Sequence, residues 1–213
     1  MRGKLITLEG GEGAGKSTVL AAIRNRLDEH EIGHLVSREP GGTALGEGVR
    51  ELVLSARLVG RVCAESELLL MFAARAQLVR EVIEPALVAG LWVVSDRYVD
   101  ASYAYQGAGR GQPVERIAAL EAWACAGVKA DLTLLLDLPI EQGLARASQR
   151  SESDRIESEQ AGFFERVRAG YRSRAAAEPG RIRVIDSSHD IETVRNDVSA
   201  ALDDFIVRSR SAP

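Results

Sequence analysis

Short apolar runs alternate along the chain with longer stretches of helical periodicity. In the longer stretches apolar residues recur every three or four positions, as in Leu20, Ile23 and Leu27. Strands that alternate with helices predict βαβ units and a parallel sheet. Parallel strands are covered on both faces, so they appear as continuous apolar runs. The pattern therefore predicts a three-layer α/β fold, a five-stranded parallel sheet flanked by helices, with strands at 5–8, 35–36, 91–94, 132–136 and 182–185.

Two segments interrupt this alternation. Residues 95–112 follow the third apolar run and hold three of the four tyrosines in what we expect to be a loop. Residues 149–160 are almost wholly polar and charged, which is typical of a surface loop. No internal repeat, low-complexity tract or Pro-rich linker divides the chain. We therefore expect a single domain over residues 1–213, with a short lid at about 149–160.

Composition and charge exclude several classes of protein. The 213 residues carry a net charge of −4, so the basic surface of a nucleic-acid-binding protein is not expected. No apolar run approaches the roughly 18 residues that a membrane span needs, and the apolar stretch at 5–8 is too short for a signal-peptide core. The two cysteines, Cys63 and Cys125, cannot form a disulfide framework. We expect a soluble cytoplasmic protein with no membrane contact.

A glycine-rich motif follows the first predicted strand and precedes a helical pattern. It fits G-x-x-x-x-G-K-[ST], in which backbone N–H groups surround phosphate oxygens. We expect Lys16 to reach the β- and γ-phosphates and the Ser17 hydroxyl to ligate Mg²⁺. A glycine-rich turn with an accidental lysine is the alternative, which the four glycines and the flanking elements disfavour. The expected ATP-binding residues are Gly10, Gly11, Glu12, Gly13, Ala14, Gly15, Lys16, Ser17 and Thr18.

Other motifs narrow the choice among proteins with this loop. A regulatory GTPase carries Asn-Lys-x-Asp and Asp-x-x-Gly, but neither Asn25 nor Asn196 precedes a lysine and no Asp-x-x-Gly occurs. Asp96 ends the third apolar run and Arg97 follows at once. A cation beside a metal-binding carboxylate favours a bridge between two phosphate-bearing substrates over a site for a hydrolytic water.

Further residues indicate an acceptor that carries a phosphate and a base. Arg38 and Arg50 are candidates for the acceptor phosphate, although each alone is equally explained as a surface arginine. Phe72 and Arg75 share a helix face, where a ring and a guanidinium can stack on a base and bond its edge. A core phenylalanine beside a surface arginine explains that pair as well.

The polar segment at 149–160 adds a cluster of cations. Arg146, Arg150 and Arg155 flank it or lie in it. An arginine supplied in cis to a transferring phosphoryl group is worth about 10³–10⁵ in rate. A solvated charged loop is the alternative, because acidic residues are interleaved with these arginines.

Together these stretches resemble the bacterial thymidylate kinase (dTMP kinase) family, in the nucleoside monophosphate kinase class of P-loop proteins. The resemblance covers nearly the whole chain and is carried by LEGGEGAGKST (8–18), REPGGT (38–43), MFAARAQ (71–77), SDRYVDASYAYQGAGRG (95–111), DLTLLLDLP (131–139) and SDRIE (153–157). It implies the P-loop NTPase fold, the reaction ATP + dTMP ⇌ ADP + dTDP with Mg²⁺, and a homodimer.

The resemblance also implies roles for individual residues. Ser17 and Asp96 would serve the metal, Arg97 would clamp the phosphates, and Glu12 would lie near the acceptor. The predicted catalytic residues are Lys16, Arg97, Glu12, Arg150 as the first choice among the lid arginines, and Arg155 as the second. The predicted dTMP contacts are Arg38 and Arg50 to the phosphate, Phe72 and Arg75 to thymine, Ser102 and Gln106 to the base, Tyr105 beneath the deoxyribose, and Arg97.

Some alternatives stay open. Many family members place the stacking phenylalanine four residues before the arginine, where this chain has Met71, so either Phe72 stacks on thymine or Met71 covers it. A deoxynucleoside kinase with Glu9 or Glu12 as base is an alternative function, as is a P-loop ATP-binding regulatory protein. The apolar helical stretch 65–89, which Pro85 is expected to bend, is explained equally by a partner surface and by core burial.

Overall fold

The computed structural model of the chain describes residues 2–148 and 154–211. Within them, five strands form one sheet in the order β2-β3-β1-β4-β5, and every neighbouring pair is parallel. This confirms the predicted five-stranded parallel sheet, with a strand at each apolar run. The strands are β1 (Leu5–Gly10), β2 (His34–Arg38), β3 (Trp92–Asp96), β4 (Leu132–Asp137) and β5 (Ile182–Asp186).

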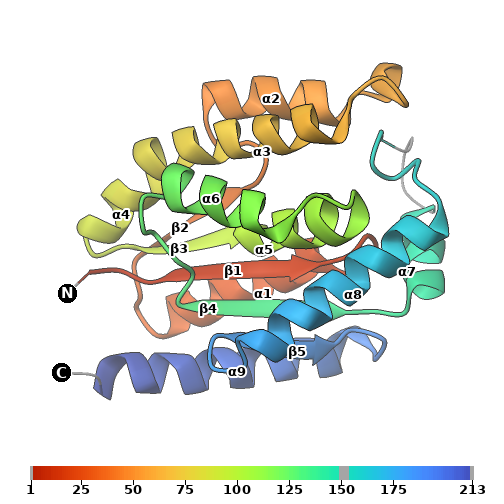
Figure 1. Cartoon of the computed structure of the whole chain (residues 1–213). Coiled ribbons are helices and arrows are strands. Elements are labelled where there is room, and N and C mark those ends of the chain that lie inside the picture. Colours follow the sequence, from red (N-terminus) through yellow and green to blue (C-terminus); the bar gives the residue numbers. More distant parts are fainter. Residues whose placement is uncertain (1, 149–153, 212–213) are drawn as a thin grey trace.

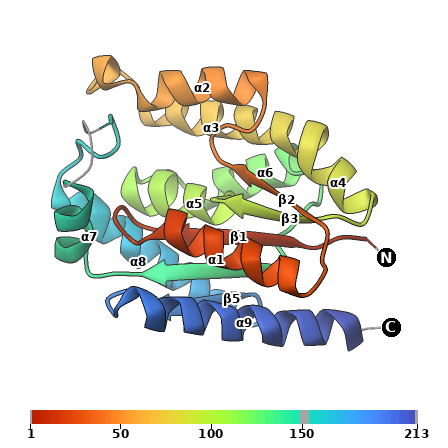
Figure 2. The ribbon, with the colours of Figure 1, turned by 180° about the vertical axis from the view of Figure 1, so that it is seen from behind.

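Helices cover both faces of the sheet and form the two outer layers of the three-layer fold (Figures 1 and 2). Alternate residues of β1 point to opposite faces, so Ile6 packs with α1 and α9 while Leu5 packs with α3 and α6. The helical elements are α1 (Lys16–Glu29), α2 (Ala44–Leu54), η1 (Ala56–Leu58), α3 (Ala64–Leu78), η2 (Val79–Ile83), α4 (Glu84–Val88), α5 (Val99–Ser102), η3 (Tyr103–Gly109), α6 (Val114–Ala124), α7 (Ile140–Ala147), α8 (Ala161–Ala177) and α9 (Ile191–Ser211).

The stretch predicted as one helix over 65–89 consists of three consecutive helical elements. α3 leads into the π-helical segment η2, and α4 follows with Pro85 in its first turn. A proline is tolerated there because the first turn of a helix does not need its backbone N–H. The irregularity therefore lies in η2, just before the proline.

The tyrosine-rich segment after β3 is helical, which differs from the loop expected from sequence. α5 runs directly into the π-helical η3. Tyr98 and Tyr103 are buried in the core cluster with α3 and α6, and Tyr105 is buried in the cluster with α8. Their hydroxyl groups are hydrogen-bonded, as buried tyrosines require.

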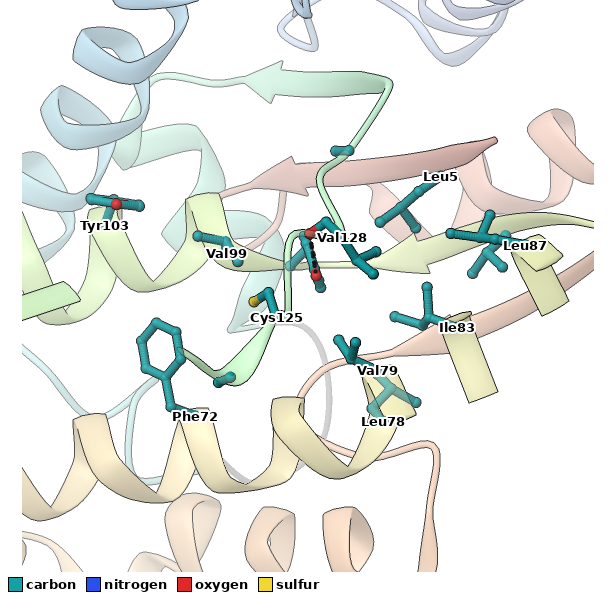
Figure 3. Close-up of a cluster of buried hydrophobic side chains, with 14 of the residues drawn as sticks. Leu5, Phe72, Leu78, Val79, Ile83, Leu87, Val99, Tyr103, Cys125 and Val128 are labelled. Carbon is teal, nitrogen blue, oxygen red and sulfur yellow. Dashed lines mark hydrogen bonds between the residues drawn. The ribbon is translucent and has the colours of Figure 1, made fainter. Parts of the chain in front are cut away.

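Phe72 belongs to the apolar core between α3 and the sheet. Its ring is 3% exposed and lies in a cluster with Val99 and Cys125 (Figure 3). Met71, the preceding residue of α3, instead joins Val49 and Val53 of α2 in a separate cluster. Consecutive residues of a helix are rotated by about 100° from each other, so these two side chains cannot share a direction.

No helix within residues 2–148 and 154–211 combines the length and the apolar character that crossing a bilayer requires.

Replacing Phe72 with alanine tests its place in the core. We expect F72A to lower the free energy of unfolding by about 3–5 kcal/mol, because it leaves a cavity among well-packed side chains. Urea denaturation followed by circular dichroism measures the change. V88A is the control, since Val88 is 67% exposed, and it should change stability little. Equal stabilities for F72A and the unaltered chain would contradict this placement.

Candidate active site

The glycine-rich loop joins the end of β1 to the start of α1. Gly13 and Gly15 have φ angles of 70° and 89°, in the left-handed region that favours glycine. A Cβ atom on Gly13 would lie 2.1 Å from the carbonyl oxygen of Gly143 in α7, so the loop backbone touches that helix. The Lys16 ammonium donates to the carbonyl oxygens of Gly10 at 3.2 Å and Gly11 at 3.0 Å. Burial and the nearby Arg97 lower the pKa of Lys16 to about 8.

A cavity of about 260 Å³ opens beside this loop, at the carboxyl ends of β1, β2 and β3. It brings together many of the predicted site residues from the loop, from β2 and α2, and from the segment after β3. The lining residues are Glu12, Gly13, Ala14, Gly15, Lys16, Ser17, Arg38, Glu39, Pro40, Arg50, Val53, Leu54, Met71, Asp96, Arg97, Ala101, Tyr105, Gln106, Asp154, Ile156 and Glu157. Gly10, Gly11 and Thr18 adjoin the lining through the same loop.

Arg97 crosses the cavity floor from β3 toward the loop. Its φ angle of 72° places it in the left-handed region, which is strained for a residue with a side chain. The guanidinium donates to the Gly10 carbonyl oxygen, the Glu12 carboxylate and the Tyr105 hydroxyl, each at 3.0 Å. Tyr105 also donates to Glu12 at 2.8 Å. These contacts hold Arg97 against the phosphate loop and against Tyr105, which is itself bonded to the loop.

Tyr171 contacts Arg97 directly and Glu9 does so through Tyr171, which the sequence did not predict. The Tyr171 hydroxyl of α8 accepts from Arg97 at 3.0 Å and donates to the Glu9 carboxyl at 2.7 Å. The Tyr98 backbone N–H donates to the other Glu9 oxygen at 2.8 Å. Burial and the charge of Asp100 raise the pKa of Glu9 to about 8.

Asp96 ends β3 beside Arg97. Its Oδ1 atom is buried and has no hydrogen-bond partner among the described residues. Because a buried carboxylate oxygen needs a partner, this atom indicates a ligand that the protein alone does not supply. Ser17 lines the same cavity. No group of three or more His, Cys, Asp or Glu side chains in the described part of the chain is arranged to hold a metal ion by itself.

Arg38 and Arg50 line the wall opposite the loop. The Arg38 guanidinium is about half exposed and pairs with Glu47 at 2.8 Å. Arg50 donates to the Pro40 carbonyl oxygen at 3.1 Å. Burial and the neighbouring Arg38 charge lower the pKa of Arg50. Two adjacent guanidinium groups facing one cavity are suited to a phosphate.

Arg75 and Ser102 are buried and do not line the cavity, and their contacts with dTMP stay a prediction. Arg75 is completely buried and donates to Glu39 Oε2 at 2.8 Å, Ser102 Oγ at 3.0 Å and the Tyr98 carbonyl oxygen at 3.1 Å. Its charge is therefore committed to the protein interior. Glu39 occupies the lining in its place, and its Oε1 has no hydrogen-bond partner among the described residues.

Phe72 is also absent from the lining, and Met71 takes that position. The Phe72 ring faces the core, where the Arg75 guanidinium lies 4.5 Å from the ring centroid. Of the two alternatives for covering thymine, this placement favours Met71. The sequence carried a signal for this outcome, since Met71 and Arg75 are four residues apart and Met71 stands where related sequences place the aromatic residue.

The two arginines predicted for the lid have different outcomes. Arg150 lies outside the described residues. Arg155 is 4% exposed and donates to the Val53 carbonyl oxygen at 2.6 Å and to the Glu67 carboxylate at 2.7 Å. These contacts hold the Arg155 guanidinium in the interior, and the catalytic role expected of it stays a prediction.

Glu67 was not singled out from the sequence. It lies four residues before Met71 in α3, so helical periodicity alone places both on one face. An acidic residue on an apolar helix face indicates a buried carboxylate, and a buried carboxylate is expected to have charged or polar partners.

Comparisons with known proteins agree in their result. The family model described as thymidylate kinase matches residues 8–198. The chain is similar to the thymidylate kinase of Methylococcus capsulatus, with 53% identity over 204 residues, 96% of this chain and 97% of the relative. The thymidylate kinase of Pseudomonas putida strain GB-1 is 50% identical over 99% of this chain and 100% of its own.

A solved structure shows the same fold. The crystal structure of thymidylate kinase from Ehrlichia chaffeensis superimposes with a TM-score of 0.76 at 29% sequence identity. The match covers 95% of this chain and 99% of that chain.

The raised pKa of Glu9 gives the stability a distinctive pH dependence. The folded chain keeps the Glu9 proton up to about pH 8, whereas the unfolded chain releases it near pH ~4.3. The fold binds more protons over this interval, so the Glu9 contribution makes the free energy of unfolding fall as pH rises through it.

We expect the unaltered chain to lose stability relative to E9Q between about pH 4.3 and pH 8, measured by urea denaturation at a series of pH values. E115Q is the matched control, because Glu115 is exposed, and its curve should run parallel to that of the unaltered chain. A parallel curve for E9Q would contradict the raised pKa.

Proposed function

The chain belongs to the thymidylate kinase family and phosphorylates dTMP to dTDP, and we propose that this transfer takes place in the cavity beside the phosphate loop. The placement of Arg97 carries the proposal. Its guanidinium is held by the Gly10 carbonyl oxygen, the Glu12 carboxylate and the Tyr105 hydroxyl. Arg97 lines the same cavity as the phosphate loop and Arg38, which supports a position between the phosphates of two nucleotides. Phosphoryl transfer depends chiefly on positioning and charge neutralisation, for which such a residue is suited.

We propose that ATP, the donor that the family uses, binds to residues 10–18. Glycine at positions 13 and 15 frees the backbone N–H groups to surround the phosphates. The Lys16 ammonium rests on two loop carbonyl oxygens, and nucleotide phosphates would offer it stronger acceptors. The pKa of Lys16, lowered to about 8 by burial and by Arg97, leaves it mostly charged at neutral pH, and an anionic ligand favours that charged form further.

Mg²⁺ fits the residues beside the loop. The unpartnered Oδ1 of Asp96 and the Ser17 hydroxyl are hard oxygen ligands, and this cation is commonly held by one or two protein oxygens together with substrate phosphates. When bound, it would neutralise charge that develops on the transferred group. Asp96 and Ser17 are the residues that would hold it.

On the acceptor side, Arg38 and Arg50 are proposed to bind the dTMP phosphate, with Glu12 and Arg97 near the transferred group. The proposed base pocket has an apolar wall, since Val53, Met71, Ala101 and Ile156 line that part of the cavity. Met71 replaces Phe72 as the side chain proposed to cover thymine, and Gln106 is its polar contact. Tyr105 is proposed to lie beneath the deoxyribose.

The remaining features of the proposal concern the whole chain. We propose one kinase domain over residues 1–213, with a lid near 149–160 that supplies Arg150. A homodimer is supported by exposed apolar side chains on α3 and α6, namely Leu69, Val114 and Trp123. A cytoplasmic location is supported by the free thiols of Cys63 and Cys125.

A coupled assay of ADP release with dTMP, dUMP, dCMP, AMP and thymidine tests this function. We expect Mg²⁺-dependent turnover with dTMP and none with thymidine, because Arg38 and Arg50 require an acceptor phosphate. Phosphorylation of thymidine and not of dTMP would contradict the proposal and favour a deoxynucleoside kinase. Slow ATP hydrolysis at a rate that does not depend on any acceptor would favour a regulatory protein.

Replacing Arg97 tests its position between the two nucleotides. We expect R97A to lower kcat by about 10²–10³, as is typical when a donor to developing charge is removed, and to change the KM for ATP much less. Steady-state kinetics with each substrate varied in turn measures the two effects. R208A removes an exposed arginine of α9 and should leave both constants unchanged. An unchanged kcat with a raised KM for ATP would place Arg97 on the donor side only.

A further inference from the structure

A single buried carboxylate joins two walls of the proposed base pocket. Glu67 of α3 is 1% exposed. It accepts from the Gln106 side-chain amide of η3 at 2.9 Å and from the Arg155 guanidinium at 2.7 Å. Arg110 adds a longer contact at 3.2 Å and is held in turn by Glu159. Burial raises the pKa of Glu67, but the Gln106 hydrogen bond and the Arg110 and Arg155 contacts outweigh this and leave it below its usual value.

The contact with Glu67 determines which end of the Gln106 amide is left without a protein partner. An ionised carboxylate only accepts hydrogen bonds, so the NH₂ end of the amide must point to Glu67. The Oε1 atom then lies at the opposite end, where it is buried without a hydrogen-bond partner among the described residues. Gln106 lines the cavity. Oε1 is therefore the acceptor of this side chain that remains for an N–H donor of a ligand.

The contact with Arg155 positions a second wall. The Arg155 side chain donates to the Val53 carbonyl oxygen, and its backbone N–H donates to that of Leu54 at 3.0 Å. Val53, Leu54 and Ile156, the residue after Arg155, all line the cavity. Glu67 neutralises the Arg155 guanidinium, which ties the 154–157 segment to the end of α2, and so it supports the apolar side of the pocket as well.

We propose that Glu67 is a positioning residue for base selection, fixing the Gln106 amide so that its oxygen faces the acceptor base. Thymine and uracil carry an N–H at ring position 3, which can donate to that oxygen. Cytosine carries an acceptor at the same position and would meet the Gln106 oxygen unfavourably. This inference rests on the proposed function, because it requires dTMP in this cavity.

The substitution E67Q tests the inference, since its amide offers an NH₂ group to which Gln106 can turn its oxygen. Gln106 would then present its own NH₂ end to the base. We expect the ratio of kcat/KM for dTMP to that for dCMP to fall about tenfold, which is the effect expected from the loss of one hydrogen bond. The KM for dTMP should rise while the KM for ATP stays unchanged. Steady-state assays with both acceptors measure these constants.

Two further variants separate this role from general support of the fold. E65Q changes an exposed carboxylate of the same helix, which contacts Gln112 but neither Gln106 nor Arg155 among the described contacts, and it should keep the unaltered dTMP-to-dCMP ratio. In a Q106A background, E67Q should no longer change that ratio. Equal losses with both acceptors, or a change of the ratio that persists without Gln106, would overturn the inference.

E67D is made in parallel in case E67Q does not fold. It keeps the negative charge for Arg110 and Arg155 but withdraws the carboxylate by one methylene group from Gln106. We expect a smaller fall of the same ratio, and an unchanged ratio in folded E67D would overturn the inference. Failure of the unaltered chain to phosphorylate dTMP would contradict the proposed function itself, whereas dTMP activity with an unchanged ratio in E67Q overturns only the role of Glu67.

Discussion

The parallel direction of all five strands is the constraint from which the site follows. Parallel strands share one carboxyl edge, and the order β2-β3-β1 places the ends of these three strands side by side. The phosphate loop, the Arg38–Glu39 turn and the Asp96–Arg97 pair follow those strands directly. Ligands in open α/β sheets bind at this edge. Residues that are far apart in the chain therefore meet in one cavity.

The interior around this cavity is unusually rich in paired charges. Arg75 pairs with Glu39, Arg155 with Glu67, and Arg97 with Glu12. Burying an ion without its partner is costly, so each of these pairs is strongly sensitive to the loss of one member. The negative net charge of the chain does not reveal this organisation. The arginines of these pairs are concentrated around the cavity, where carboxylates fix their orientation. The cavity is shaped as much by these supporting pairs as by its lining residues.

The sequence was informative wherever function depends on local order along the chain. Five apolar runs predicted the sheet, and the spacing within the glycine-rich motif predicted Lys16 and Ser17 beside the cavity. It was less informative where function depends on the rotation of a helix. Met71 and Phe72 differ by one position and face different clusters. Arg75 and Arg155 have the residue type of ligand contacts, but only the tertiary structure reveals the carboxylates that hold them in the interior.

The close approach of Gly13 to Gly143 has a consequence for how the nucleotide site is completed. A Cβ atom on Gly143 would lie 2.5 Å from the carbonyl oxygen of Glu12. Neither position 13 nor position 143 therefore has room for a side chain. The phosphate loop thus packs tightly against α7, a helix that begins only at Ile140. A fragment that ended before α7 would carry the complete motif yet lack the surface that gives the loop its shape. During synthesis, the binding site is complete only after most of the protein has emerged.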